Sequence, residues 1–269
     1  MSDNPVIKSE QHNSVQLRGV SHFIDSIAVT QLPTQLQNRR NIKSLTVSSI
    51  LYIRNSQNKM SSENVILDCE DVQSLLIKYG TELKEMRSSL SDPVDCIIDD
   101  VLCYRFLKGF KFSVSKASIQ LEKMNKWRRE NKMTDLRSVA EHQQQSEFPH
   151  YSTIVKYYPH NIGHSHDKKG QPLSIERFGL TNPHHLCKNL TLEELMEYHY
   201  SHMENKAALA ARLTRQTGKV IRLVKIVDLT GLGRKHLSKR GLEYFKHALQ
   251  ISQEYYPEHL GTMCVGSLS

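Results

Sequence analysis

A histidine-rich segment offers the first candidate for chemistry. His160, His164, His166 and Asp167 lie close together in the sequence, and imidazole and carboxylate groups are common zinc ligands. The segment ends in Asp-Lys-Lys-Gly, however, and a glycine at that position supplies the positive φ that a solvent-exposed turn requires. We therefore expect residues 160–171 to form a polar loop without a bound metal, and zinc binding is the alternative.

Two further patterns could indicate a nucleotide-binding protein or an enzyme. Gly231 and Gly233 follow an apolar stretch, as in a phosphate-binding loop, but the dinucleotide fingerprint needs a third glycine where His236 stands. His184 and His185 are adjacent, but no nucleophile stands at a spacing that would predict a catalytic triad. The residues therefore predict no catalytic site and no cofactor.

The cysteines and the N-terminus favour an intracellular protein. The five cysteines form no CxxC pair and do not recur at the spacing of metal ligands, so we expect structural thiols in a reducing compartment. The first residues lack the basic and apolar regions of a secretory signal, and no apolar run is long enough to cross a bilayer. We expect a cytoplasmic protein whose association with membranes is peripheral and transient.

The excess of basic residues is compatible with several partners. The formal net charge is +8, from 36 Lys and Arg against 28 Asp and Glu, which would attract anionic membranes, nucleic acids or acidic proteins. Zinc-finger and RNP-type signatures are missing, and the basic residues are dispersed over expected helices instead of alternating with aromatic residues. We therefore expect contact with an anionic membrane surface and no nucleic acid partner, although nucleic-acid binding stays open as a minor alternative.

The elements that must position these residues fall into three segments. Residues 1–60 are rich in Gln, Asn and Ser without a sustained period of apolar residues, which predicts a mostly disordered extension. Apolar residues in 61–142 recur at helical spacing, which predicts a small all-helical domain. Strand-like and helical patterns alternate in 149–269. The expected fold class is therefore α/β, with flanking helices on a mixed sheet and a helical domain before it.

Three helices are expected in the helical domain. The first helix covers 65–79, and Gly80 ends its pattern. The second covers 94–108, and the third begins after Ser113, which is its N-cap. Apolar residues of the third helix step by three or four positions along one face up to Trp127. Basic residues take the opposite side, which we expect to be exposed to solvent: Lys123, Lys126, Arg128 and Arg129.

Strands and longer helices are expected in the α/β domain. Short strands are predicted over 154–158 and 173–178. Thr191 opens a capping box, so a helix should begin there and end before Gly218. The β-branched, nearly continuous apolar run 220–229 has the composition of a central strand that is covered on both faces. The apolar residues that mark a last helix are Leu242, Phe245, Ala248 and Leu249.

Four motifs in order resemble the CRAL-TRIO lipid-binding family. YRFLKGFKF at 104–112, followed by WRR at 127–129, is similar to the LRFLRARKF and KWRK stretches of the family's helical leader. DKKGQP at 167–172 is similar to the family's DKDGRP turn, and VDLTGL at 227–232 is similar to its (I/V)DLxGL strand end. YYPEHLG at 255–261 resembles YYPERLG. The glycine-containing segment that follows the third motif is most similar to the branch that includes phosphatidylinositol- and tocopherol-transfer proteins.

The resemblance implies both a fold and a function. In this family a sheet forms the floor of an apolar pocket, helices form its roof, and a mobile gate helix admits one lipid. Binding and exchange of a lipid between membranes are implied, and neither requires catalysis. A pocket that replaces bilayer contacts stabilises an acyl chain by roughly 0.8 kcal/mol per buried CH₂ and leaves the headgroup to polar residues. The expected ligand is a phospholipid or another hydrophobic lipid.

The resemblance also marks residues expected to contact the lipid. In phosphoinositide-binding members the second arginine of LRARKF helps to bind the headgroup phosphate, and Phe110 stands here in its place without a donor. The hydroxyl residues that serve phosphatidylcholine in some members correspond to Leu223 and Lys225, and His259 replaces the arginine of YYPERLG. The identity of the headgroup therefore stays open. The expected lipid-binding residues are Lys111, Ser174, Leu223, Lys225, Glu258 and His259.

The sequence after the last motif departs from the family pattern. Members continue with a hydrophobic strand, an Asn-Ala-Pro-like turn, the gate helix and further sheet, whereas this chain closes with residues 262–269. The resemblance therefore implies a C-terminally truncated domain in which the strand at 220–229 exposes a sheet edge.

Two functions from different classes follow. The first is a lipid-binding or lipid-transfer protein of the CRAL-TRIO type, which the four ordered motifs support. The alternative is a regulatory domain that binds proteins instead of lipids, or an inactive truncated product, as Phe110 and the missing gate indicate.

Overall fold

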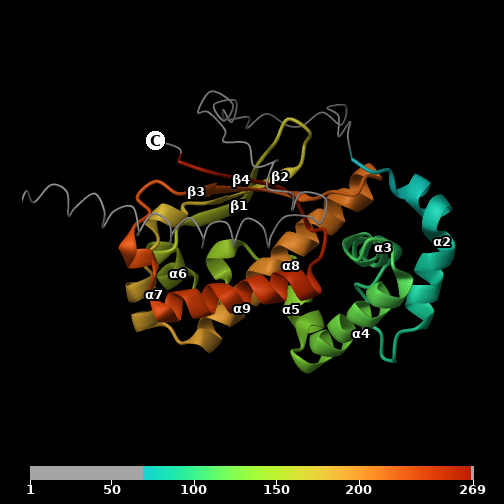
Figure 1. The fold of residues 1–269 in the computed structure, drawn as a ribbon, viewed down its shortest axis with the longest axis horizontal. Helices are drawn as coiled ribbons and strands as arrows, with labels where there is room; N and C mark the ends of the chain where they lie inside the picture. Colours follow the sequence, from blue (N-terminus) through green and yellow to red (C-terminus); the bar gives the residue numbers. More distant parts are fainter. Residues whose placement is uncertain (1–68, 268–269) are drawn as a thin grey trace, which may run out of the picture.

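A sheet covered by helices on one face forms the larger part of the molecule (Figure 1). The computed structural model describes residues 69–267, apart from the side chains of 162–164. A group of helices, α2 to α4, lies beside the sheet at one end of the molecule. This arrangement is the α/β class with flanking helices that the sequence predicted. The extension expected over 1–60 lies outside the described residues, and the domain boundaries stay predictions.

Helices α2 to α4, which we call the helical leader, share an apolar core. Leu83, Met86, Phe106, Leu107 and Leu121 are almost completely buried in it, and burying such a side chain stabilises the fold by about 1.5–3 kcal/mol. Helix α5 follows the leader and packs against α8. The bounds are Val72–Ser88 for α2, Asp100–Gly109 for α3, Val114–Glu130 for α4 and Met133–Ala140 for α5.

The first two helices of the leader differ from their expected bounds. Helix α2 continues through Gly80, because Leu83 and Met86 on the following turns are buried in the leader core. Their burial outweighs the cost of about 1 kcal/mol that a glycine imposes on a helix interior. Helix α3 begins at Asp100 instead of residue 94, since the Asp99 carboxylate accepts a hydrogen bond at 2.8 Å from a backbone N–H of the first turn.

The basic side of α4 is not uniformly exposed, and the prediction for Arg128 was wrong. Its side chain is 1% exposed and donates hydrogen bonds of 2.7 Å to the carboxylates of Asp95 and Glu204. Nη1 of Arg137 on α5 lies 3.4 Å from the Glu204 carboxylate on α8. We call these four residues the junction cluster, because they connect the leader with α5 and α8. The periodicity of α4 could not reveal Arg128's partners, which lie on other segments.

Four strands form a mixed sheet in the order β1-β2-β3-β4. Strand β1 is antiparallel to β2, whereas β2, β3 and β4 are parallel to one another. Strand β3 lies inside the sheet between two neighbours, which confirms the prediction of a central strand. The bounds are His160–His166 for β1, Pro172–Glu176 for β2, Leu223–Asp228 for β3 and Leu260–Gly266 for β4.

Two segments before β2 differ from the sequence-based expectation. Residues 154–158, expected as a strand, mostly belong to helix α6, because Ile154 and Tyr158 lie one helical turn apart and are both buried in the core beneath the sheet. Residues 160–166, expected as part of a loop, form β1. Strand β1 lies at the edge of the sheet and is held by backbone hydrogen bonds to β2, so it needs few apolar side chains. The polar sequence of β1 therefore did not predict a strand.

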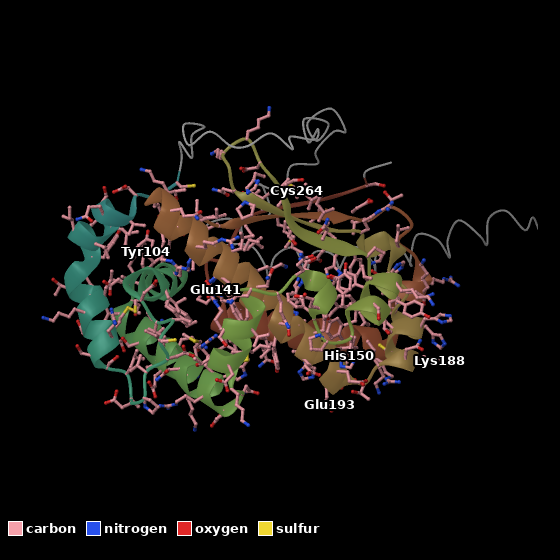
Figure 2. The ribbon with its side chains drawn as sticks, turned by 180° about the vertical axis from the view of Figure 1, so that it is seen from behind. Tyr104, Glu141, His150, Lys188, Glu193 and Cys264 are labelled. Carbon is pink, nitrogen blue, oxygen red and sulfur yellow. The ribbon has the colours of Figure 1, made fainter. Side chains whose placement is uncertain are left out.

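The described chain ends in a strand that the sequence analysis did not expect. Strand β4 pairs with β3 in parallel along its length, so β3 does not expose the edge that was predicted for it. Met263 and Val265 of β4 pack on the side of the helices, and Cys264 packs with Ile226 on the opposite face. Figure 2 shows Cys264 on the sheet and Tyr104 in the helical leader at one end of the molecule.

Helices α8 and α9 cover one face of the sheet and roof the space above β3 (Figure 1). The predicted capping box of α8 is confirmed, because the Thr191 hydroxyl accepts from the N–H of Glu194 at 3.2 Å while the Glu194 carboxylate accepts from the N–H of Thr191 at 2.8 Å. Gly218 ends α8 with a φ of +66°. The remaining bounds are Tyr151–Tyr157 for α6, Pro183–Asn189 for α7, Leu192–Thr217 for α8 and Lys239–Tyr255 for α9.

No described helix has both the length and the hydropathy that crossing a membrane requires.

Candidate functional site

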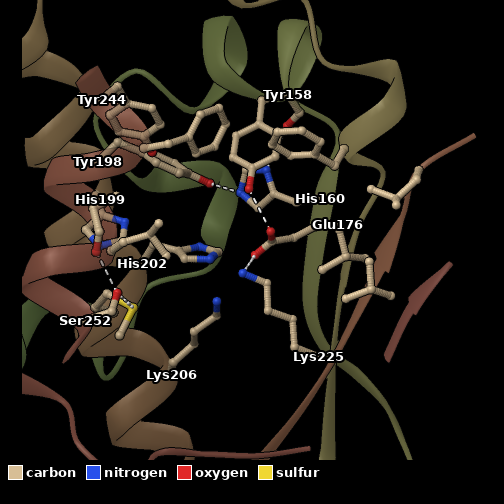
Figure 3. A pocket seen from close by; sticks show the side chains of 18 residues that line it. Tyr158, His160, Glu176, Tyr198, His199, His202, Lys206, Lys225, Tyr244 and Ser252 are labelled. Carbon is tan, nitrogen blue, oxygen red and sulfur yellow. Dashed lines mark hydrogen bonds and ion pairs between the residues drawn. The ribbon is translucent and has the colours of Figure 1, made fainter. Parts of the chain in front are cut away.

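A pocket lies between the sheet and the two long helices (Figure 3). It holds about 880 Å³ of atom-free space, part of which is open to solvent. The second half of β3 forms its floor, and α8 and α9 form its roof, so it lies near the carboxyl ends of the parallel strands, where ligands of α/β proteins commonly bind. Its apolar wall is made of Phe178, Met203, Val227, Leu229, Phe245, Ala248, Leu249 and Val265.

An ion pair occupies the polar end of the pocket. The Glu176 carboxylate on β2 lies 2.9 Å from Nζ of Lys225 on β3 and accepts a hydrogen bond from the Tyr158 hydroxyl at 2.8 Å. Burial by itself would raise the pKa of Glu176, but the ammonium groups of Lys225 and Lys206 and these hydrogen bonds lower it to about 2. The carboxylate is therefore ionised at neutral pH and already has its partners.

Lys206 on α8 brings a second ammonium group to this end. Its Nζ points toward the pair formed by Glu176 and Lys225 (Figure 3). It forms no hydrogen bond or ion pair with a residue of the described range. Burial lowers the pKa of Lys206 from 10.5 to about 8, an effect that the nearby Glu176 opposes and Lys225 increases. Lys206 is thus mostly charged at pH 7 without a direct counter-ion.

Neutral imidazoles surround these charges. His160 on β1 contacts the Tyr198 hydroxyl at 2.6 Å through Nε2 and the backbone carbonyl of Tyr158 at 2.7 Å through Nδ1. Burial lowers the pKa of His199 to about 3 and lowers that of His202 as well, so both are uncharged. Nε2 of His199 and Nδ1 of His202 are buried without a hydrogen-bond partner in the described part of the chain. The pocket therefore contains polar atoms that a ligand could satisfy.

His160, the first histidine of the histidine-rich segment, is held by other protein groups. Both ring nitrogens of His160 are engaged by protein groups, as above, and its side chain is buried. Among the side chains between 69 and 267 that the structure describes, no three His, Cys, Asp or Glu residues converge as metal ligands do.

Three of the six residues expected to contact lipid lie on the sheet face that carries the pocket. Lys225 lines the pocket itself. Ser174 and Leu223 share this face, since each stands two residues before a pocket residue on the same strand. Both are buried, and the Ser174 hydroxyl has no partner in the described residues. They lie beyond the pocket lining toward the start of β3, and their roles in binding stay predictions.

The other three expected residues lie away from the pocket. Lys111 is exposed after α3. The Glu258 carboxylate lies 3.5 Å from Nε of Arg222 and 3.8 Å from Nζ of Lys108, where it connects the leader with the start of the sheet. His259 is buried beside the leader, with Nδ1 at 3.1 Å from a backbone carbonyl. None of these three residues lines the pocket, and their ligand roles also stay predictions.

The sequence pattern did not predict most of the residues at the polar end of the pocket. Glu176 stands in a predicted strand, but its burial next to Lys225 depends on the register between β2 and β3. Tyr198, His202 and Lys206 are spaced by four residues and therefore share one face of α8. A polar stripe on a helix face that should pack against a sheet was a signal that could have indicated a ligand site.

Known proteins are similar in sequence to parts of this chain. Residues 157–268 match the family model of the CRAL/TRIO domain. The phosphatidylinositol/phosphatidylcholine transfer protein SFH11 of Arabidopsis thaliana is 32% identical over 167 residues, which are 61% of this chain and 43% of that protein. Protein real-time of Aedes aegypti is 23% identical over 261 residues, or 91% of this chain and 38% of that protein. The chain thus spans about two fifths of the length of these curated relatives.

Among solved structures, the crystal structure of Sfh5 aligns with a TM-score of 0.46 and 15% sequence identity, over 72% of this chain and 68% of that chain.

The matched segment, 157–268, contains all four strands, α8, α9 and the pocket between them. Residues 157–268 belong to the CRAL/TRIO domain family.

Proposed function

We propose that this chain binds one lipid in the pocket and exchanges it between membranes. The observation that carries the proposal is an apolar pocket with a single polar end, enclosed by the sheet and by α8 and α9 of a CRAL/TRIO domain. The acyl chain would lie along the apolar wall, and the head would lie against the polar end. Relatives named as phosphatidylinositol/phosphatidylcholine transfer proteins support this assignment.

The physical basis is the transfer of hydrocarbon from one apolar environment to another. Each CH₂ that leaves the bilayer gives up roughly 0.8 kcal/mol of hydrophobic stabilisation and regains it when the pocket wall covers it. Exchange is then close to balanced in free energy, and no bond has to be made or broken. Peripheral contact with an anionic membrane is part of the proposal, since the net charge of +8 favours it.

A transfer assay between vesicles tests the proposal. Purified protein should move a fluorescent lipid from donor to acceptor vesicles that contain phosphatidylserine. Ala248 faces the pocket from α9 and is 8% exposed, so Ala248→Trp should fill the pocket and lower the transfer rate at least tenfold. Ile119 on α4 is 58% exposed, and Ile119→Trp, the matched control, should transfer like the wild type. Thermal unfolding monitored by circular dichroism verifies that both variants fold.

A negative result has a defined meaning. If the wild-type protein moved no phospholipid, tocopherol or retinoid, and native mass spectrometry found no co-purified lipid, the proposal would be overturned. The protein-interaction alternative would then be favoured. Equal transfer by Ala248→Trp and the wild type would instead show that the lipid occupies another site.

A further inference from the structure

The charged groups at the polar end of the pocket are not balanced. One carboxylate, Glu176, faces two ammonium groups, Lys225 and Lys206. Lys225 forms the ion pair at 2.9 Å, and the Tyr158 hydroxyl occupies the other carboxylate oxygen. Lys206 is left with a favourable but indirect interaction with Glu176. The described part of the pocket therefore carries one positive charge in excess.

An unpaired ammonium group in an apolar pocket is unfavourable for the free protein. A buried charge loses its hydration, and only a nearby opposite charge or a set of hydrogen bonds compensates for that loss. Lys206 lies on the α8 face that also carries Tyr198 and His202, and its side chain lines the pocket. The lowered pKa of Lys206 agrees with an uncompensated charge.

The groups around Lys206 favour an anion over a cation as its partner. A choline-like or amine head would need a free carboxylate, and both oxygens of Glu176 already have partners. An anionic group would accept hydrogen bonds from the Lys206 ammonium and from Nδ1 of His202 in its protonated tautomer, which has no partner in the described residues. The acyl chain of the same molecule would then lie along the apolar wall.

We infer that the pocket selects lipids with an anionic group, a carboxylate or a phosphate, at the end of the acyl chain, and that Lys206 binds this group. The inference rests on the proposed function, because it names the ligand class of the same pocket. It predicts a preference that depends on the charge of the head and not on the length of the chain.

Equilibrium binding of three lipids with one acyl chain tests the inference. Oleic acid and 1-oleoyl-lysophosphatidic acid should bind to the wild-type protein at pH 7 at least tenfold more tightly than oleyl alcohol. Lys206→Met should reduce this ratio to near one and leave the affinity for the alcohol almost unchanged. Lys206→Arg, which keeps the charge, should retain the preference. Lys246→Met removes an exposed charge from α9 and is the matched control.

The possible outcomes separate the inference from the function on which it rests. If the wild type binds acid and alcohol equally, or if Lys206→Met keeps the full preference, the inference is overturned while lipid binding stands. If the wild type binds none of the three lipids, the proposed function fails. Displacement of oleic acid by millimolar inorganic phosphate would show an anion site that is independent of the acyl chain, which also contradicts the inference. Preference for only one of the two acids identifies the head.

Discussion

The junction cluster and the polar end of the pocket both bury charged groups, but only the junction cluster is balanced. Two guanidinium groups, Arg128 and Arg137, face the carboxylates of Asp95 and Glu204. Burial would lower the pKa of Arg128, but Glu204 and Asp95 raise it above its ordinary value. Burial would likewise raise the pKa of Asp95, but Arg128 and neighbouring hydrogen bonds lower it. Arg128 and Asp95 therefore hold each other in the charged form.

The charged groups at the polar end of the pocket are not balanced. Its two ammonium groups share the single carboxylate of Glu176, and the pKa of Lys206 moves down instead of up. The difference indicates two roles for buried charge in one chain. A balanced set of fixed partners holds two segments together, whereas an unbalanced set beside an open cavity leaves a position for a ligand. Three predictions can break or sharpen this contrast.

The largest effect is expected from Arg128→Met. It leaves Asp95 buried without its guanidinium partner and weakens the pairing of Glu204, and breaking such a set typically costs about 3–5 kcal/mol. Urea unfolding at pH 7 measures the loss. Arg129→Met on the same helix is the control, since that arginine is part-exposed and its ion pair of 3.9 Å should contribute less than about 1 kcal/mol. Similar losses for both variants would show that burial of Arg128 has no special role.

Glu176→Gln should have the second largest effect. The glutamine resembles the protonated carboxyl group, so at pH 7 the variant should lose about 3 kcal/mol of unfolding free energy, given the lowering of the Glu176 pKa from 4.5 to about 2. Because the folded-state pKa lies below the unfolded one, this contribution is present above pH 4.5 and disappears as the pH falls toward 2. The stabilities of wild type and variant should therefore converge over that interval in urea unfolding.

The same variant sharpens the contrast between the two regions. Removal of the carboxylate takes away the anion that both Lys206 and Lys225 face, so the preference for oleic acid over oleyl alcohol should increase. Glu243→Gln, which neutralises an exposed carboxylate on α9, is the control and should change neither stability nor preference. A weaker preference in Glu176→Gln would indicate that the carboxylate itself contacts the head.

The smallest effect is a pH dependence of binding. The affinity for oleic acid relative to oleyl alcohol should fall by roughly tenfold between pH 7 and pH 9, because Lys206, with a pKa of about 8 in the empty pocket, loses its charge. The other titratable and charged groups that face the pocket are Glu176, Lys225, His160, His199, His202, Tyr158, Tyr198 and Tyr244.

Most of these groups keep their charge state over this interval. The pKa values of Glu176 and the three histidines are lowered, and those of the three tyrosines are raised above 10, so none of them titrates between pH 7 and pH 9. A ratio that stays constant to pH 9 would contradict the role of Lys206.

Local signals predicted a large part of the fold. The capping box at Thr191 and the glycine at 218 were confirmed, because each depends on residues that are close in the sequence. The central strand was confirmed within 220–229, where it spans Leu223–Asp228. A strand was also confirmed at the place predicted as 173–178, and it spans Pro172–Glu176. Helix α6 and strand β1 were missed, since Ile154 turns into the core and β1 is held by backbone bonds to β2, and neither contact is visible in a short window.

By itself, the sequence determined the family, the class of fold and the elements whose ends are set by neighbouring residues. Only the tertiary structure decided which charged groups lack a partner. Glu176, Lys206 and Lys225 stand on β2, α8 and β3, and they meet because β2 and β3 are in register and α8 crosses above them. The helical pattern of α4 predicts an exposed Arg128, but the structure buries this residue beside Glu204 on α8. A residue's charge belongs to its sequence, but whether that charge is compensated depends on long-range packing.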